Sequence, residues 1–331
     1  VMVANAKVAA FKASPSVLQQ EAEALSARIK REHSKQKNWK LKLPNAEYLS
    51  QWFAEPVLAK LAFILQAIKE GTSPKLQNVF RVVLSDICRE VSLQDPGDLR
   101  IRRRKDAACD YPVNEIFTEA LDTKIAFILK ARTEINPPKS KQRAIQADIR
   151  HCSKRILSAA QPFDAAITSP PYVTALPYID TQRLSLCLMG LIDSGEIRNT
   201  EKSLIGNREI SDIERVNAEL ALFSNKGKLP DSVSAFCQSL HHKADHPGHG
   251  FRRKNVPALT YTYFSQMAEM FTSVQKLIQP RGQFALLVGA NKTTLQNEEI
   301  VIDTPNLLGE VAQSRGWQVK ESLSFETYQR F

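Results

Sequence analysis

The residues best suited to chemistry form one short stretch, Ser169-Pro170-Pro171-Tyr172, called the tetrad below. It directly follows an apolar segment, Asp164–Thr168, which we expect to be a buried strand. Each proline ring fixes φ and removes a backbone donor. The turn therefore offers hydrogen-bond acceptors, the Ser169 hydroxyl and the Pro170 carbonyl, with no neighbouring N–H to compete for them.

Two acceptors beside an aromatic ring suit the exocyclic amino group of a nucleic-acid base. The lone pair of that nitrogen is delocalised into the base, so the amine is a poor nucleophile. Acceptors that hold its protons would localise the lone pair during attack on a sulfonium methyl, while Tyr172 stacks on a base taken out of the helix. Much of the catalysis would then be positioning. A Pro-Pro turn without function is the alternative reading of these four residues alone.

The elements that must position the tetrad lie after Pro138, where short apolar strands alternate with helices. The pattern predicts strands at 144–146, 164–168, 283–288 and 318–325, and helices at 181–192, 263–278 and 305–315. Such alternation indicates an α/β fold with a mostly parallel sheet and helices on both faces. Ligands bind such sheets at the carboxyl ends of the strands, and Asp148 and Ser169 both stand at such ends.

The sequence before Pro138 has a different pattern, in which apolar residues recur at helical spacing. We expect residues 1–138 to be mostly helical and residues 139–331 to form the catalytic core. The predicted helices cover 14–30, 46–53, 56–69, 74–91 and 114–133. Within the core, residues 195–258 are predicted to be irregular and polar, and to contact the DNA target.

The tetrad and its surroundings resemble the amino-group DNA methyltransferases, in which the Ser-Pro-Pro-Tyr form is typical of cytosine-N4 enzymes. FDAAITSPPYVTALPYIDTQRLSL resembles that family's motif IV, and QADIRH (146–151) resembles motif III. LIGNREI (204–210) and GFRRKNVPAL (250–259) resemble its target-side segments. The likeness covers residues 140–331 well and the helical first part loosely.

This resemblance implies a Rossmann-like methyltransferase sheet with a large helical insertion. It implies a site-specific enzyme that moves a methyl group from S-adenosylmethionine to the N4 of cytosine in duplex DNA, with the target base flipped, in restriction–modification or phage defence. The tetrad, Ser169, Pro170, Pro171 and Tyr172, would be catalytic. Asp148, Ile149 and Thr168 would contact the cofactor.

The sequence departs from the family at the cofactor loop. A glycine-rich turn between a strand and a helix is needed for close backbone approach to the cofactor. The only G-x-G here, Gly248-His249-Gly250, lies in a polar stretch with no strand before it. VMVANAKVAAFKA (1–13) resembles the helix that follows the second strand of such a domain, just downstream of the cofactor loop. We therefore expect a missing segment or a partner chain to supply the glycine loop.

Composition is compatible with a polyanionic partner. The chain of 331 residues carries 45 Lys+Arg against 35 Asp+Glu, a net charge of +10, which favours phosphate contacts. The expected DNA-contacting residues are Arg102, Arg103, Arg104 and Lys105, and Arg252, Arg253 and Lys254. Five cysteines without a CxxC pair argue against disulfides, and no apolar run is long enough to cross a membrane. These features predict a cytoplasmic protein with no membrane partner.

Two further groups of residues allow other interpretations. Cys237, His241, His242, His246 and His249 have spacings that zinc could use, but we favour solvated histidines and expect no metal. Asn291 stands either at the rim of the site or as a strand-end cap. For the chain as a whole, the rivals are adenine-N6 methylation, an RNA methyltransferase, and a non-catalytic DNA-binding or scaffold subunit.

Overall fold

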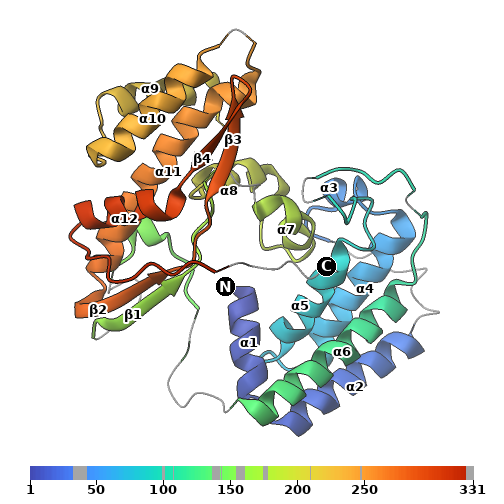
Figure 1. Ribbon diagram of the computed structural model, residues 1–331. Helices are drawn as coiled ribbons and strands as arrows, with labels where there is room; N and C mark the ends of the chain where they lie inside the picture. The colour runs from blue at the N-terminus through green and yellow to red at the C-terminus, as the bar shows by residue number, and fades with distance from the viewer. Residues whose placement is uncertain are drawn as a thin grey trace. The chain divides into compact units, whose positions relative to one another are not determined.

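The computed structural model of the chain describes residues 1–32, 43–98, 101–106, 108–135, 142, 144–153, 161–173, 178–208, 210–246 and 248–325. The chain divides into two compact units (Figure 1). The first unit comprises Val1–Gln146 and Leu176–Thr200, and the second comprises Ala147–Ala175 and Glu201–Phe331. The boundary predicted between residues 138 and 139 lies outside the described residues.

The first unit is helical in its described part. Its helices are α1 (Met2–Lys12), α2 (Pro15–Arg31), α3 (Ala46–Ser50), α4 (Glu55–Gly71), α5 (Gln77–Cys88), α6 (Val113–Glu134) and α7 (Tyr178–Leu188), followed by the short η3 (Ser194–Glu196) and by α8 (Ile197–Ser203). The five helices predicted from apolar spacing before Pro138 are all present. In α2, for example, the Ser14 hydroxyl caps the first turn and Leu18, Ala22, Leu25 and Ile29 are buried.

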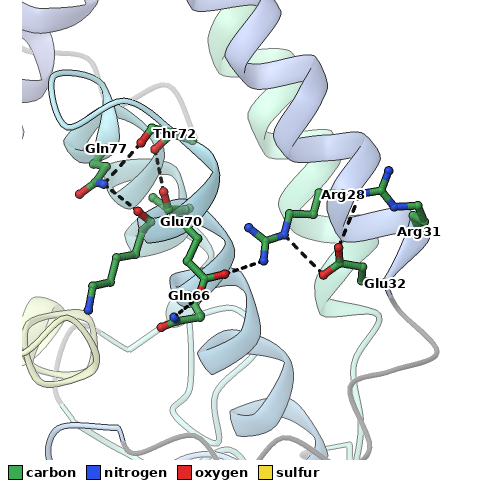
Figure 2. A network of polar contacts seen from close by, with 9 residues as sticks. Arg28, Arg31, Glu32, Gln66, Glu70, Thr72 and Gln77 are labelled. Atoms are coloured by element: carbon green, nitrogen blue, oxygen red, sulfur yellow. Dashed lines mark hydrogen bonds and ion pairs between the residues drawn. The ribbon is translucent and has the colours of Figure 1, made fainter.

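A polar network joins three helices of this unit (Figure 2). The Arg28 guanidinium on α2 donates to Glu70 on α4 at 2.7 Å and to Glu32 at 3.4 Å. The Gln77 amide at the start of α5 donates to the Lys69 carbonyl at 3.0 Å. The Arg28 side chain is only 20% exposed, so water screens its ion pairs less than those of a free surface arginine.

The second unit is mixed α/β. Strand β1 (Phe163–Thr168) pairs in parallel with β2 (Ile278–Leu286), and β3 (Asn291–Leu295) pairs in antiparallel with β4 (Glu298–Ile302). Its helical elements are η2 (Ile149–His151), α9 (Asp212–Phe223), α10 (Asp231–Ala244), α11 (Phe251–Gln275) and α12 (Thr304–Ser314). The core of the unit lies between α11, α12 and the two parallel strands, and includes Phe264, Met267, Phe271 and Val311.

Several predictions for the core were correct. The strands expected at 164–168 and 283–288 correspond to β1 and β2, and the helix expected at 305–315 corresponds to α12. Gly316, which directly follows the predicted helix, has φ +85°, the left-handed conformation that glycine adopts without strain. The parallel sheet is small: β1 and β2 are its two strands among the residues described.

Two strand predictions were wrong. Residues 144–146 and 318–325 have no regular secondary structure. Both have strand-like composition, but a strand also needs a neighbour to accept its backbone hydrogen bonds, and none pairs with either segment in the described chain. For the same reason β1, expected to be buried, has one paired edge only, and its Ile167 is 85% exposed.

The prediction that residues 195–258 are irregular was also wrong, because α8, α9, α10 and the first turns of α11 fill most of this range. Its polar residues lie on the solvent side of helices whose opposite faces are buried, as at Val233 and Cys237 of α10. Polar composition alone cannot separate a loop from a helix that is apolar on one face.

The hairpin of β3 and β4 was not predicted. Its two-residue turn, Gln296-Asn297, has φ +50° and +64°, as a type I′ hairpin turn requires at both positions. Gln at the first position is not one of the usual signals for this turn. Among the described helices, none has the length and apolar character needed to cross a bilayer.

Candidate active site

The tetrad begins where β1 ends, as the sequence predicted. Parallel pairing continues past the strand, because the Leu287 amide donates to the Thr168 carbonyl at 3.0 Å. The Ser169 hydroxyl then donates to the Leu287 carbonyl at 3.1 Å. A hydroxyl has one proton and two lone pairs, so this bond uses the proton and leaves the oxygen free to accept. Ser169 is exposed, and its oxygen can accept a hydrogen bond.

The backbone after the tetrad is anchored while the Tyr172 ring remains accessible. Val173 is fully buried, and Tyr172 is 36% exposed. The Asn291 amide at the start of β3 donates to the Val173 carbonyl. Asn291 was expected either near the site or as a strand-end cap, and its amide holds the residue that follows the tetrad.

A second segment packs directly against the tetrad. Gly206, between α8 and α9, has φ +78°. A Cβ atom at this position would lie 3.2 Å from the Tyr172 carbonyl oxygen and 3.3 Å from the Pro171 Cβ. Only glycine allows both this conformation and this approach. Gly206 was not among the predicted site residues, although it lies in the LIGNREI segment whose likeness pointed to the target side.

Asp148 is exposed in part but already has a partner. Its side chain caps η2 through the Arg150 amide at 2.9 Å and forms an ion pair with the Arg150 guanidinium at 2.6 Å. The hydrogen bond from Arg150 lowers the pKa of Asp148, so the carboxylate is charged at neutral pH. Arg150 also donates to the Ser203 carbonyl at 2.9 Å. It therefore links the Asp148 segment to the chain just before Gly206.

The other two predicted cofactor contacts have different surroundings. Ile149 is 36% exposed and offers an apolar surface beside Asp148. Thr168 is half-buried, and its carbonyl is used by Leu287. These residues, Arg150 and the tetrad all belong to the second unit.

The predicted basic cluster Arg252, Arg253 and Lys254 forms the first turn of α11. All three side chains are exposed, and no ion pair joins them to another described residue. The next residue, Asn255, is buried. The cluster is therefore a free basic surface on a helix that continues into the core of the unit.

The predicted basic run Arg102–Lys105 belongs to the first unit. Some of its side chains already bind other residues of the protein. Arg104 donates to the Gln94 carbonyl at 3.1 Å and to the Tyr111 hydroxyl at 2.8 Å. Arg103 stacks over the Trp52 ring, 5.5 Å from its centroid. The side chain of Arg102 is 65% exposed and Lys105 is exposed. Arg102 also forms a 3.9 Å ion pair with Asp98, and Arg103 donates to the Gln51 carbonyl. The three arginines therefore have protein partners.

The histidines near residue 245 do not gather around a common point. Among the described residues, no group of three His, Cys, Asp or Glu side chains is arranged to hold a metal ion. His249 is buried, and both of its ring nitrogens are used. Nδ1 lies 3.0 Å from the Ala244 carbonyl, and Nε2 accepts from the Gln296 amide at 3.0 Å.

Comparison of the chain with protein-family models, with curated proteins and with solved structures found no match.

Proposed function

We propose that the chain is the catalytic part of a DNA methyltransferase that modifies the exocyclic N4 of cytosine at a specific duplex sequence. The observation that carries this proposal is the Ser169 hydroxyl at the end of β1. Its proton is bound to the Leu287 carbonyl, so its lone pairs face solvent as acceptors. An acceptor held in this way matches the need of a weakly nucleophilic amine.

The residues of the chain would act by holding and orienting the base. The Ser169 oxygen and the Pro170 carbonyl would each accept a hydrogen bond from the amine, and the accessible Tyr172 ring would stack on the flipped base. Asn291 would hold the turn through the Val173 carbonyl, and the absence of a side chain at Gly206 lets its segment pack closely against the turn. No covalent intermediate with the protein is needed, because the amine itself would attack the sulfonium methyl group. The carbon–sulfur bond would break as the nitrogen–carbon bond forms, and the methylated amine would lose one proton to solvent.

S-adenosylmethionine would supply the methyl group, and the described residues fit it in part. Ile149 is open to an adenine ring, and Asp148 is charged, but Arg150 already binds that carboxylate. The sequence has no glycine-rich turn after a strand. We assign Asp148, Ile149 and Thr168 as one side of a cofactor site, whose other side would come from a glycine loop in a further segment or a partner chain.

The exposure of β1 supports this arrangement. One edge of β1 pairs with β2, and Ile167 and Phe163 on β1 are 85% and 43% exposed. Apolar strand residues with so much exposure are unusual in a finished sheet. Further helices covering this face of β1, and further strands at its other edge, would complete a Rossmann-like sheet, with the helical first unit as an insertion.

Mass spectrometry of nucleosides tests the proposal on DNA incubated with S-adenosylmethionine and the protein, with the glycine loop provided by an upstream segment or partner chain. We expect N4-methylcytosine, and a loss of roughly 100-fold in rate for Ser169→Ala, by analogy with removal of one polar group from a transition-state site. Ser232→Ala, on α10, is a matched control with the wild-type rate. Detection of N6-methyladenine without N4-methylcytosine would mean that the target base is adenine and not cytosine.

The rival function is a non-catalytic DNA-binding or scaffold subunit, favoured by the missing glycine turn. Calorimetric titration with S-adenosylmethionine distinguishes the two. The enzyme predicts binding once the glycine loop is provided by an upstream segment or partner chain. If the chain retains DNA affinity but does not bind S-adenosylmethionine even when the glycine loop is provided, the scaffold function is favoured.

A further inference from the structure

The second unit contains a polar groove that the tetrad does not line. Its volume is about 620 Å³, within the usual range for small-molecule sites. Helix α11, the segment after Asp148, the loop after α9 and the end of α12 form its walls. The residues that matter for its chemistry are Arg150, Lys226, Ser265, Glu269, Lys276 and Arg315.

Helix α11 presents one polar face to this groove. Ser265, Glu269, Thr272 and Lys276 recur at the spacing of helical turns and all line it. The Ser265 oxygen is buried and has no hydrogen-bond partner among the described residues. This oxygen is covered by neighbouring atoms, so a ligand in the groove would meet the exposed cations that line it.

The wall of the groove opposite α11 lies close to that helix at Gly227, which has no side chain. A Cβ atom on Gly227 would lie 2.5 Å from the Ser265 oxygen, so any larger residue would displace this wall. The Gly227 amide donates to the Tyr261 hydroxyl at 2.7 Å. The loop is therefore held against α11, and the groove is built into the unit.

The charge that lines the groove is mainly positive and uncompensated. Lys226 and Lys276 are exposed, and their amino groups form no ion pair with another described residue. Arg315 donates to the Gly227 and Lys228 carbonyls at 2.7 and 3.0 Å, which leaves its charge unneutralised. Asp148 offsets Arg150, and Glu269 is the one carboxylate among the lining residues.

We propose that this groove binds a phosphate group, carried either by a small phosphorylated molecule or by a nucleic-acid backbone. Lys226, Lys276 and Arg315 come from separate elements and line the same groove, and amino and guanidinium groups are the side chains that bind phosphate oxygens. The groove uses no residue of the tetrad, and the two positions substituted below, Lys226 and Lys276, are not among the assigned cofactor contacts.

Calorimetric titration of the full chain with inorganic pyrophosphate, and separately with a short DNA duplex, tests the proposal. The variant is Lys226→Gln with Lys276→Gln, both exposed positions. The control is Lys320→Gln, an exposed lysine of the same unit outside the groove. Circular dichroism of each variant checks that the fold is retained.

We expect the wild type to bind pyrophosphate and the double variant to bind it about tenfold or more weakly, with Lys320→Gln unchanged. If the natural source is a nucleic-acid backbone, the double variant also loses duplex affinity, and its salt slope falls by about 1.8. If the source is a small molecule, duplex affinity does not change. Absence of pyrophosphate binding by the wild type, or equal binding by the double variant, would overturn the proposal.

Discussion

At the scale of single residues, the direction of one hydroxyl proton decides what Ser169 can do. If the hydroxyl donated to a ligand, the site would suit an anion or a carbonyl. Because it donates to the Leu287 carbonyl at 3.1 Å, the oxygen is left as an acceptor and suits an amine. The specificity of the candidate site thus depends on the register of β1 and β2, which brings Leu287 beside Ser169.

Gly206 provides a residue-scale prediction. Gly206→Ala should lower the free energy of unfolding by about 1–2 kcal/mol, because φ +78° is strained for an L-residue and the new methyl group would press on the Tyr172 carbonyl. Gly309→Ala is the matched control. Its Cβ would lie in ordinary contact, 3.6 Å from Val319, and helix α12 should gain about 0.5–1 kcal/mol.

Urea unfolding followed by tryptophan fluorescence measures both changes. The substitutions should shift the midpoint in opposite directions. A shift of the same sign for both would show that Gly206 is not held in a strained conformation against the tetrad.

At the scale of elements, helix starts and hairpin turns are held by side chains that a pattern of apolar residues does not show. Helix α9 begins with a capping box, in which Ser211 and Glu214 exchange hydrogen bonds. His249 joins the β3–β4 turn to the end of α10 through both ring nitrogens. Each contact connects one local backbone feature to another and defines where an element begins or how it packs.

Glu214 predicts a pH dependence. The hydrogen bond from Lys202, assisted by Ser211, lowers the pKa of Glu214 from its usual 4.5 to about 2. A depressed pKa in the folded state stabilises the protein above pH 4.5, and this contribution is lost as the pH falls towards 2. The difference in unfolding free energy between wild type and Glu214→Gln should therefore be about 1 kcal/mol at pH 7 and close to zero at pH 2.

Unfolding measured between pH 2 and 7 gives this difference. Glu321→Gln, at an exposed position, serves as the control and should show no such dependence. A constant difference for Glu214→Gln across the range would contradict the assignment of the ion pair and cap.

His249 predicts how strongly the hairpin is attached. Removing a buried ring that makes two hydrogen bonds should cost about 2–3 kcal/mol in His249→Ala. His242→Ala, at an exposed position of α10, should change stability by no more than about 0.5 kcal/mol. Thermal unfolding measures both variants, and amide hydrogen exchange at Gln296 shows whether the turn is released. Slow exchange retained at Gln296 in His249→Ala would argue against this attachment.

At the scale of the whole molecule, charge is the property most relevant to a nucleic-acid partner. The net charge of +10 would attract DNA without specifying a surface. The structure separates the basic clusters into one whose arginines already have protein partners, around Arg104, and one that is free, at the start of α11. Net charge alone predicts that removing any three positive charges weakens DNA binding equally. The structure predicts a larger effect where the charges are free, at the start of α11.

Glutamine at Arg252, Arg253 and Lys254 together should lower DNA affinity at every sequence and reduce the salt slope by about 2.7, since each phosphate contact contributes roughly 0.9. The control has the same charge change at Lys7, Lys12 and Lys130, which are exposed on the first unit. Fluorescence anisotropy at several salt concentrations measures both slopes. Equal slopes for the two triple variants would mean that the α11 cluster is not a DNA-contacting surface.

Local sequence was sufficient for most helices and for the two parallel strands. Apolar spacing in α2, and the run from Phe163 to Thr168, lie within a single element and depend on nearby residues only. The position of the tetrad at the end of β1 follows from the same information. The strands expected at 144–146 and 318–325 failed because pairing requires a partner from elsewhere in the chain, which periodicity does not identify.

The sequence by itself determined which groups are available: the hydroxyl, carbonyl and ring of the tetrad, the charge of Asp148, and the basic runs. Tertiary structure alone decided how they are used. It brought Gly206 and Asn291 to the tetrad, directed the Ser169 proton to Leu287, and joined Arg150 to the Ser203 carbonyl. The physical reason is that hydrogen bonds and ion pairs between residues distant in sequence depend on chain topology and strand register. The local spacing of apolar residues does not specify either of these.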